Sequence, residues 1–495
     1  MNVDSHSTIT SYITEYELTF RSYREYPLAT FEENLERILV SQIDGCRGLK
    51  HAERLSGGAA QETYRIECVT ESGVRLLAMR RAAGGVTRPP NDTQPGLAAE
   101  ARMMQCAKEA GVPTPEIYYV LSRDDDLGDG FIMEWLEGEG LGTRILRDQQ
   151  LANIRPQLAY ECGRIAARIH GIDVVEKELD KLLVTMTPAD YVQQTWSRYK
   201  EVGTPHPMID YVGSWLMQHL PETYRTVLVH NEFRNGNLMV SSEGIVGVVD
   251  WEVAHLGDPM RDLGWLCTSA WRYGESLPVG GFGTYDQLFQ GYEDESGISV
   301  DPGHVFFWEV FGSFWWSVTC LGMVEQFRYG PDPSIERAAI GRRAYEGQVD
   351  CVNLLIPGSV ALLEPTLDKQ NVDSPRSQEL LSAVSTFLRN DVMQETGGRT
   401  RFLARVSANV IDIILRETRD LQLYRQMELD SLCKLFSVDG ESLEALRWRL
   451  VESLRKKGCR LDDESMQAHL RQTVVNQIAI DNPKYSGLEQ ALNWK

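Results

Sequence analysis

The sequence predicts an α+β protein in which a small antiparallel β-sheet near the N-terminal end is followed by helices over most of the remaining chain. The sheet is indicated by three strand-like segments between residues 52 and 80, which are separated only by short turns. Aromatic and aliphatic residues recur at helical spacing beyond residue 260, which indicates packed helices. Pro365, Asn371 and Pro375 then interrupt the periodicity, so we expect a separate, all-helical unit beyond them.

The individual elements of the first 140 residues can be placed from turn residues and apolar runs. The proline-rich stretch at residues 87–95 excludes a helix there. The acidic turn at residues 124–130 lacks the trailing glutamate of a calcium loop, so we interpret it as the tip of a hairpin. The predicted elements are strands at residues 52–56, 63–69 and 74–80, a helix at 97–110, and strands at 116–122 and 131–135.

The charge of the chain is unevenly distributed. The formal net charge is −21, while residues 375–495 are almost neutral, so nearly all of the excess acid lies in the preceding part. This argues against nucleic acid as a partner, because phosphate contacts need clustered lysine and arginine. The sequence has neither an apolar run of about 20 residues nor a charged-then-apolar N-terminus, which argues against a membrane span and a signal peptide. The nine cysteines include no CxxC pair, which favours reduced thiols, a cytoplasmic location and no zinc site.

The segment from His230 to Asp250 carries polar residues at the spacing of a phosphoryl-transfer site. Glu232 follows the histidine by two residues, Asn237 follows it by seven, and Asp250 ends the next apolar run. Phosphoryl transfer needs a carboxylate to orient the hydroxyl and oxygen ligands for Mg²⁺. Glu232 suits the first role, and Asn237 and Asp250 suit the second. The turn at residues 241–244 predicts a β-hairpin with one ligand at each base, and an ordinary hairpin with polar flanks is the alternative.

Three runs within this region, at residues 230–237, 249–259 and 262–266, resemble the aminoglycoside phosphotransferase superfamily. They are most similar to its branch of kinases that are fused to, or encoded beside, acyl-CoA dehydrogenases, because Asp-Trp-Glu-x-Ala-x-x-Gly-Asp-Pro is specific to that branch. The resemblance spans about residues 30 to 350 and implies a bilobal, protein-kinase-like fold that uses ATP and Mg²⁺. Residues 401–410 resemble a small uncharacterised helical family whose members are often encoded next to such kinases.

The resemblance also implies a domain organisation. An N-terminal extension at residues 1–29 precedes a nucleotide-binding lobe at 30–138, which has a small antiparallel sheet. A mostly helical lobe at 139–362 would hold the catalytic and acceptor-binding elements. A linker at 363–375 would lead to an all-helical accessory domain at 376–495.

By resemblance, the nucleotide would be bound by residues of the first lobe. Arg80 stands where kinases place a phosphate-binding lysine, and its planar fork would hold the phosphates. Glu100 is the expected partner of Arg80, and a solvated carboxylate at a helix start is the alternative. The turn at Gly57-Gly58 would let main-chain N–H groups approach phosphate, although by itself it is an ordinary hairpin connection. The residues assigned to ATP are Gly57, Gly58, Arg80, Glu100, and the main-chain groups near Glu134 and Leu136.

One departure from the family pattern lies in the catalytic position itself. The superfamily usually has His-Gly-Asp where this chain has His230-Asn231-Glu232. The extra methylene of glutamate displaces the carboxylate, and a misplacement of ~1 Å can cost on the order of a hundredfold in rate. We favour a retuned enzyme, because both expected metal ligands are present. A slow enzyme and a non-catalytic ATP-binding scaffold are the alternatives.

The resemblance implies a kinase that phosphorylates an alcohol of a small molecule. The implied acceptor is a hydroxyacyl-CoA, especially a 4-hydroxyacyl-CoA, and the implied partners are enzymes of the acyl-CoA dehydrogenase pathway. An aminoglycoside, aminosugar or amino alcohol is the alternative acceptor. The helical C-terminal unit would either complete the CoA pocket or mediate homodimer formation.

Three further groups of polar residues stand out, and two of them are candidates for binding a phosphate of the substrate. Arg342 and Arg343, adjacent in the chain, are the first candidate. Arg405, Asn409 and Arg416 could share one helix face, for which an ordinary solvated face is the alternative. The run at residues 455–460 could meet a phosphate or form a basic last helical turn with a glycine cap. The aromatic stripe between residues 265 and 327 is expected to be mainly core, with some of its members lining the acceptor pocket.

Overall fold

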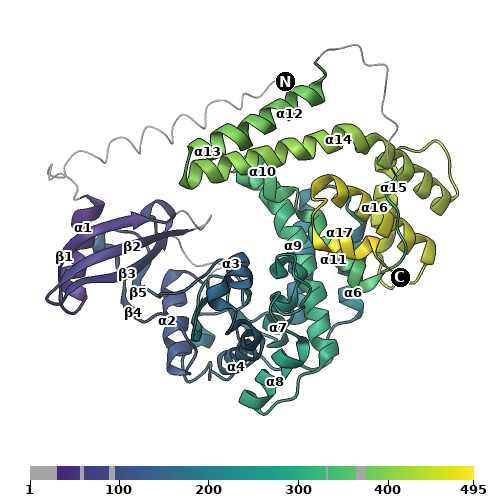
Figure 1. Ribbon diagram of the computed structural model, residues 1–495. Helices are drawn as coiled ribbons and strands as arrows, with labels where there is room; N and C mark the ends of the chain where they lie inside the picture. The colour runs from purple at the N-terminus through teal and green to yellow at the C-terminus, as the bar shows by residue number, and fades with distance from the viewer. Residues whose placement is uncertain (1–29, 56–60, 88–94, 331–332, 364–374, 495) are drawn as a thin grey trace, which may run out of the picture.

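The computed structural model describes residues 30–55, 61–87, 95–330, 333–363 and 375–494. The N-terminal extension, the Gly57-Gly58 turn and nearly all of the expected linker lie outside these ranges. Figure 1 shows a small β-sheet lobe, purple to blue, beside a larger helical lobe, with the last helices lying over the helical lobe. This is the α+β arrangement that the sequence predicts.

The first lobe is built on one antiparallel sheet whose strands follow the order β1-β2-β3-β5-β4. In β2, buried residues alternate with half-exposed ones, so the strand presents one face to a small core. Thr30 caps the helix that covers this core, and its side chain accepts the N–H of Glu33. The elements are α1 (Phe31–Gln42), β1 (Cys46–Arg54), β2 (Gln61–Thr70), β3 (Gly73–Ala82), α2 (Leu97–Glu109), β4 (Ile117–Val120) and β5 (Gly130–Glu134).

Strand β1 begins at Cys46, six residues before the predicted start at residue 52. The additional residues include Arg47, Lys50 and His51, which are exposed. As an edge strand, β1 pairs only with β2, and its exposed polar side chains hide its start in the sequence. The other predicted elements of this lobe are observed with ends that differ by one or two residues.

The second lobe surrounds the long helix α9, which is apolar on all sides and lies in the centre of the molecule. Two short antiparallel ladders, β6 with β9 and β7 with β8, hold the segment that contains the expected catalytic residues. The elements are α3 (Gly142–Arg147), α4 (Leu158–His170), α5 (Pro188–Val202), α6 (Pro207–Gln218), β6 (Val227–Val229), β7 (Leu238–Ser241), β8 (Gly244–Val248), β9 (His255–Gly257), α7 (Met260–Cys267), α8 (Tyr285–Ser296), α9 (Pro302–Tyr329), α10 (Ile335–Gly341) and α11 (Ala344–Leu355).

The last helices pack directly against the second lobe. Helices α16 and α17 contact α11, α15 contacts α6, and α14 contacts α10. Leu446, Leu470 and Ile478 belong to the same continuous core as the buried residues of the second lobe. The unit expected to be separate therefore shares its core with its neighbour. Its elements are α12 (Ser377–Phe387), a π-helical turn (Leu388–Val392), α13 (Met393–Glu395), α14 (Gly398–Phe436), α15 (Leu443–Leu454), α16 (Glu464–Asp481) and α17 (Ser486–Leu492).

A buried ion pair joins the C-terminal helices to the second lobe. Arg455, just after α15, donates from Nε to Asp210 Oδ1 of α6 at 2.7 Å. Asp210 is completely buried and also accepts from Trp196 Nε1 at 2.9 Å and Tyr199 Oη at 2.9 Å. Arg455, the first residue of the basic run at 455–460, therefore makes a structural ion pair and does not serve as a phosphate ligand.

We expect Arg455→Gln to lower the free energy of unfolding by about 3 kcal/mol, because it leaves the carboxylate of Asp210 buried without its cation. Chemical denaturation of the two proteins measures this difference. Arg449→Gln is the matched control, since Arg449 of α15 makes an exposed pair with Glu441 at 3.3 Å, which is expected to contribute less than about 1 kcal/mol. Equal losses for the two variants would contradict the assignment.

The described residues contain neither a disulfide nor a helix suited to cross a membrane. None of the nine cysteines, all of which lie in the described ranges, takes part in a disulfide. Among the described helices, none combines the length and the apolar character that a membrane crossing requires.

Candidate active site

The two short ladders position the segment that the sequence predicts to be catalytic. It leaves β6 after Val229, passes through residues 230–237 and enters β7 at Leu238. In the β7–β8 hairpin Leu238 pairs with Val248, and the N–H of Val249 donates to the carbonyl oxygen of Asn237 at 3.0 Å. The hairpin expected from the sequence is therefore present, and it brings Asn237 and Asp250 to the same end.

Glu232 is held by two neighbours from its own loop. Arg234 Nε donates to Glu232 Oε2 at 2.9 Å, and Asn237 Nδ2 donates to the main-chain oxygen of Glu232 at 2.9 Å. Asn237 Nδ2 also lies 3.5 Å from Glu232 Oε2. The guanidinium of Arg234 stacks on the ring of Trp271, with its Cζ 4.1 Å from the ring centroid. These contacts fix the orientation of the longer glutamate side chain.

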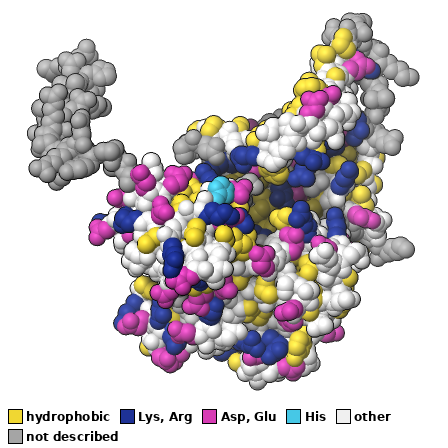
Figure 2. Space-filling view, turned by 60° about the vertical axis from the view of Figure 1, so that its left-hand side comes forward, with side chains coloured by type: hydrophobic (Ala, Val, Ile, Leu, Met, Phe, Trp, Pro, Cys, Tyr) yellow, Lys and Arg dark blue, Asp and Glu magenta, His cyan; other side chains and the backbone are white. Residues whose placement is uncertain are grey.

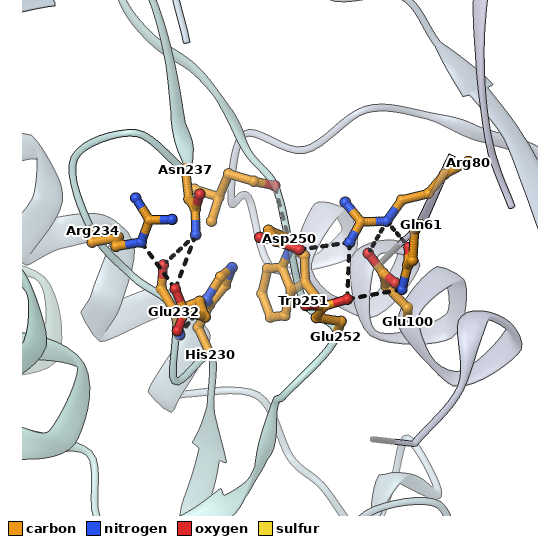
Figure 3. A network of polar contacts seen from close by, with 11 residues as sticks. Gln61, Arg80, Glu100, His230, Glu232, Arg234, Asn237, Asp250, Trp251 and Glu252 are labelled. Atoms are coloured by element: carbon orange, nitrogen blue, oxygen red, sulfur yellow. Dashed lines mark hydrogen bonds and ion pairs between the residues drawn. The ribbon is translucent and has the colours of Figure 1, made fainter. Parts of the chain in front are cut away.

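Asp250 connects this loop to the β-sheet lobe. Arg80 of β3 donates from Nη2 to Asp250 Oδ1 at 2.6 Å, and its Nε lies 3.2 Å from Glu100 Oε1 of α2. Gln61 at the start of β2 accepts from Arg80 Nε and donates from Nε2 to Glu252 Oε2 at 3.0 Å. Figure 3 shows Glu232 with Arg234 and Asn237 on one side, Arg80 with Gln61 and Glu100 on the other, and Asp250 between them.

The electrostatics of the site follow from its burial. Burial disfavours the charge of Arg80, but Glu100, Asp250 and Glu252 outweigh this and raise its pKa. Burial likewise opposes ionisation of Asp250, but Arg80 lowers the pKa of Asp250 below its usual value. Burial raises the pKa of Glu232, although Arg234 favours its charged form. Burial also raises the pKa of Glu100 to about 7. Asp250 therefore remains a carboxylate, and Glu232 has an increased affinity for a proton.

Asp262 of α7 anchors the start of the loop formed by residues 230–237. Its two carboxylate oxygens accept the main-chain N–H groups of His230 at 2.9 Å and Asn231 at 2.7 Å. His170 Nε2 lies 3.0 Å from Asp262 Oδ2. Asp262 is fully buried. Burial opposes its ionisation, but the hydrogen bond from His170 and the charges around it lower its pKa. The loop thus rests on a charged acceptor that receives two main-chain donors.

Asn231 has a left-handed backbone, with φ of 69°, at the position where the family usually has glycine. Asparagine tolerates this conformation better than most residues. Its buried side chain is also used, because Nδ2 donates to Tyr191 Oη at 2.8 Å and Oδ1 accepts from Arg261 Nε at 2.9 Å. Replacing glycine with asparagine therefore adds contacts and preserves the turn.

The imidazole ring of His230 contacts two neighbours, Glu232 and Trp251. Its Nδ1 accepts the N–H of Glu232 at 3.2 Å, and its ring lies 4.4 Å from that of Trp251. Burial lowers the pKa of His230 to about 4, so the imidazole is neutral at ordinary pH and can accept. Asp258 has an anchoring role in the Gly-Asp-Pro turn, where it accepts the N–H of Met260 at 3.0 Å.

We expect Asp262→Asn to reduce kcat by about tenfold to a hundredfold and the free energy of unfolding by about 2 kcal/mol. The amide offers only one oxygen acceptor in place of two, so one loop N–H would face another donor and the carboxylate of Glu232 would shift. Initial rates and chemical denaturation measure the two effects. Asp286→Asn, at an exposed position of α8, is the control. A variant with unchanged kcat would show that this anchor does not position the loop.

The remaining nucleotide candidates lie at the end of the inner strand β5 and in the crossing between lobes. The Glu134 side chain accepts the N–H of Glu116 at 3.1 Å, and the Glu134 N–H donates to the Glu116 carbonyl at 2.8 Å. This N–H is therefore used within the sheet. The side chain of Leu136 packs closely against Gly247 of β8. A Cβ atom added at Gly247 would lie only 2.4 Å from Leu136 Cδ1. Gly57 and Gly58 lie outside the described residues.

Four residues of the site were given no role from the sequence. These are Gln61, Arg234, Glu252 and Asp262. Arg234 lies in the same loop as Glu232. Its position two residues after this carboxylate indicates from the sequence that the two side chains can pair. Gln61 and Asp262 act through contacts between segments far apart in the chain, and sequence spacing does not reveal such contacts.

The residues at the hairpin base suit a magnesium ion bound together with a nucleotide. The described residues contain no group of three or more His, Cys, Asp or Glu side chains placed to hold a metal. Mg²⁺ usually uses one or two carboxylates together with waters and substrate phosphates. Since Asn237 donates from Nδ2 to Glu232, its Oδ1 remains an acceptor at the same hairpin end as Asp250. This donor set fits Mg²⁺ with phosphate oxygens as further ligands.

The comparison with known families agrees with this geometry. Residues 51–296 match the model of the Phosphotransferase enzyme family. Residues 394–485 match a family described as Domain of unknown function (DUF6285). A crystal structure of a candidate aminoglycoside phosphotransferase from Ralstonia eutropha is similar over 65% of this chain and 97% of that chain, with 23% identity and a TM-score of 0.52. This likeness confirms the expected bilobal, kinase-like fold.

Curated relatives are similar over the same region. Acyl-CoA dehydrogenase family member 10 of Mus musculus is 29% identical over 265 residues, which is 51% of this chain and 23% of the relative. Acyl-CoA dehydrogenase family member 11 of Rattus norvegicus is 21% identical over 331 residues, which is 62% of this chain and 42% of the relative. The matches therefore cover less than half of the length of these relatives.

Proposed function

Because residues 51–296 form a domain of the phosphotransferase enzyme family, we propose that this protein is an ATP- and Mg²⁺-dependent kinase that phosphorylates an alcohol of a small molecule. The observation that carries the proposal is the convergence of Glu232, Asn237 and Asp250 at one hairpin end, with Arg80 reaching Asp250 from the other lobe. A carboxylate, two oxygen ligands and a cation are the groups that phosphoryl transfer requires.

Each residue has one role in this proposal. Glu232 orients the acceptor hydroxyl and accepts its proton, and its pKa, raised by burial, increases its basicity. Asn237 and Asp250 would hold Mg²⁺, which when bound would neutralise charge on the β- and γ-phosphates. Arg80 would bind phosphate oxygens, and Glu100 would hold Arg80 in place. The main chain near Leu136, at the crossing between lobes, would contact the adenine.

The acceptor that we propose is a hydroxyacyl-CoA, in particular a 4-hydroxyacyl-CoA. The names of the curated relatives support an acceptor from acyl-CoA metabolism. The chemistry is consistent with this choice, since phosphorylation turns hydroxide, a poor leaving group, into phosphate. Enzymes of acyl-CoA oxidation would then act on the product.

Acceptor-dependent ADP release tests the proposal. The assay contains ATP and Mg²⁺ and compares a 4-hydroxyacyl-CoA, the corresponding free acid and an aminoglycoside panel. Release with the thioester and not with the free acid is expected. Release only with an aminoglycoside would overturn the acceptor assignment. ATP binding without ADP release from any acceptor would instead indicate a non-catalytic scaffold.

A further inference from the structure

A cavity between the second lobe and the C-terminal helices contains a concentration of basic side chains. The cavity has a volume of about 450 Å³ and lies between α10 and α11 on one side and α14 and the α16–α17 connection on the other. This volume is in the range of pockets that bind small molecules. The cations that line it are Arg342, Arg343, Arg389, Arg416 and Lys484.

The cavity lining is more basic than the chain as a whole. Three carboxylates, those of Glu346, Asp412 and Asp481, line the cavity with the five cations. Glu417 pairs with Arg342 at 2.8 Å from outside the lining, so the cations still exceed the carboxylates by one in a protein with a formal charge of −21. Two of the cations have no carboxylate partner among the described residues. Arg416 donates to the main-chain oxygens of Ile480 and Asp481, and Lys484 is exposed. The excess favours an anionic ligand.

A row of side chains connects this cavity to the catalytic carboxylate. Arg343 stacks on Trp316 of α9, with its Cζ 5.0 Å from the ring centroid. The rings of Trp316 and Trp271 meet edge to face, with centroids 5.2 Å apart. The guanidinium of Arg234 stacks on Trp271, and Arg234 donates a hydrogen bond to Glu232. Only four contacts therefore separate the basic cavity from the proposed base.

The aromatic part of this row has unused hydrogen-bond donors. Within the described residues, the indole N–H groups of Trp271 and Trp316 are buried and have no hydrogen-bond partner. Trp271 is only 7% exposed. Buried donors are nearly always paired, so these two are suited to meet polar atoms of a bound molecule. In Figure 2, one face of the molecule is hollowed, with hydrophobic side chains inside the hollow and Lys and Arg side chains around it.

We propose that the cavity between α10–α11 and α14–α16 binds the phosphate-bearing tail of the acceptor, so that the C-terminal helices complete the acceptor site. This rests on the proposed function, since the other end of the acceptor presents its hydroxyl to Glu232. The aromatic row lies between the cavity and Glu232, so the uncharged middle of the molecule would run along it. Arg342 and Arg343, which the sequence suggested as phosphate ligands, meet in this cavity with Asn409 and Arg416, which the sequence placed on one helix face. Arg405 does not line it.

Equilibrium binding of free CoA tests the proposal without requiring turnover. Calorimetry is carried out with saturating ADP and Mg²⁺, so that the adenine of CoA cannot occupy the nucleotide site. CoA is expected to bind at least tenfold more tightly than pantetheine, which lacks the nucleotide phosphates. Arg416→Gln is expected to weaken CoA binding by about tenfold and Lys484→Gln by about fivefold, with a smaller change for pantetheine.

Arg405→Gln is the matched control, because Arg405 is an exposed residue of the same helix α14. Its CoA affinity is expected to equal that of the wild type. If Arg416→Gln fails to fold, the exposed Lys484→Gln variant still decides the outcome. Equal binding of CoA and pantetheine to the wild type would overturn the proposal. Unchanged CoA affinity in the folded variants would also overturn it.

The same variants separate this proposal from the proposed function. If the variants lose CoA binding but the wild type phosphorylates no thioester, the binding site is retained and the acceptor assignment is rejected. Phosphorylation of a hydroxyacyl-CoA with a KM unaffected by either substitution would retain the function and reject the site. A KM that rises for the CoA thioester and not for the pantetheine thioester would support both.

Discussion

Asp250→Asn is expected to reduce kcat by about 10³-fold, which corresponds to about 4 kcal/mol of transition-state stabilisation. Asp250 has a left-handed backbone with φ of 73°, which asparagine tolerates, so the substitution preserves the fold of the loop. It removes the charge that would hold Mg²⁺ and that pairs with Arg80 at 2.6 Å. Steady-state rates at several Mg²⁺ concentrations measure the effect, and a higher Mg²⁺ requirement should accompany the lower kcat.

Glu252→Gln is the matched control for this prediction. Glu252 is two residues away and also lies near Arg80, at 3.6 Å, but it has no proposed role as a metal ligand. We expect its effect on kcat to be much smaller than that of Asp250→Asn. Equal losses would indicate that the charge around Arg80 matters and that Asp250 has no separate role.

Glu232→Gln is expected to reduce kcat by about 10²-fold and to leave ATP binding nearly unchanged. Glutamine has the size of glutamate and retains an oxygen acceptor for Arg234, but it cannot take a proton from the acceptor hydroxyl. The expected loss is at the low end for general bases, since phosphoryl transfer depends more on positioning and charge than on proton removal. Rate measurements and nucleotide titrations on the same preparation separate the two effects.

Glu232→Asp tests whether the loop is built for the longer side chain. Arg234 and Asn237 contact the glutamate, and Arg234 is itself held on Trp271. Shortening the side chain draws the carboxylate away from these partners, so we expect a lower kcat than in the wild type. A Glu232→Asp variant more active than the wild type would show that glutamate is a defect at this position.

Much of the β-sheet lobe could be predicted because β2 alternates between buried and half-exposed residues and short turns bound the strands. The start of β1 could not, since its outer residues are polar on an edge strand. Helix α14 continues from Gly398 to Phe436, far beyond residues 401–410, which resemble a helical family in the sequence. Its later turns carry many charged residues, and these weaken the apolar periodicity.

The candidate site was predictable where it depends on local spacing and not where it depends on tertiary contacts. Asn237 and Asp250 lie at the two bases of one hairpin, and hairpin pairing follows from the sequence. The contact between Arg80 and Asp250 joins residues 170 positions apart. The packing of the C-terminal helices on the second lobe also depends on buried pairs, such as Asp210 with Arg455, that no single segment reveals.

The most direct test of the central claim is acceptor-dependent transfer of the γ-phosphoryl group. ADP release is measured with ATP and Mg²⁺ in the presence of a 4-hydroxyacyl-CoA or of the acyl-CoA of equal length that lacks the hydroxyl. The account predicts release with the hydroxylated thioester, formation of a phosphorylated thioester in equal amount, and loss of both in Asp250→Asn. Equal release with and without the hydroxyl, or no difference between the wild type and Asp250→Asn, would contradict it.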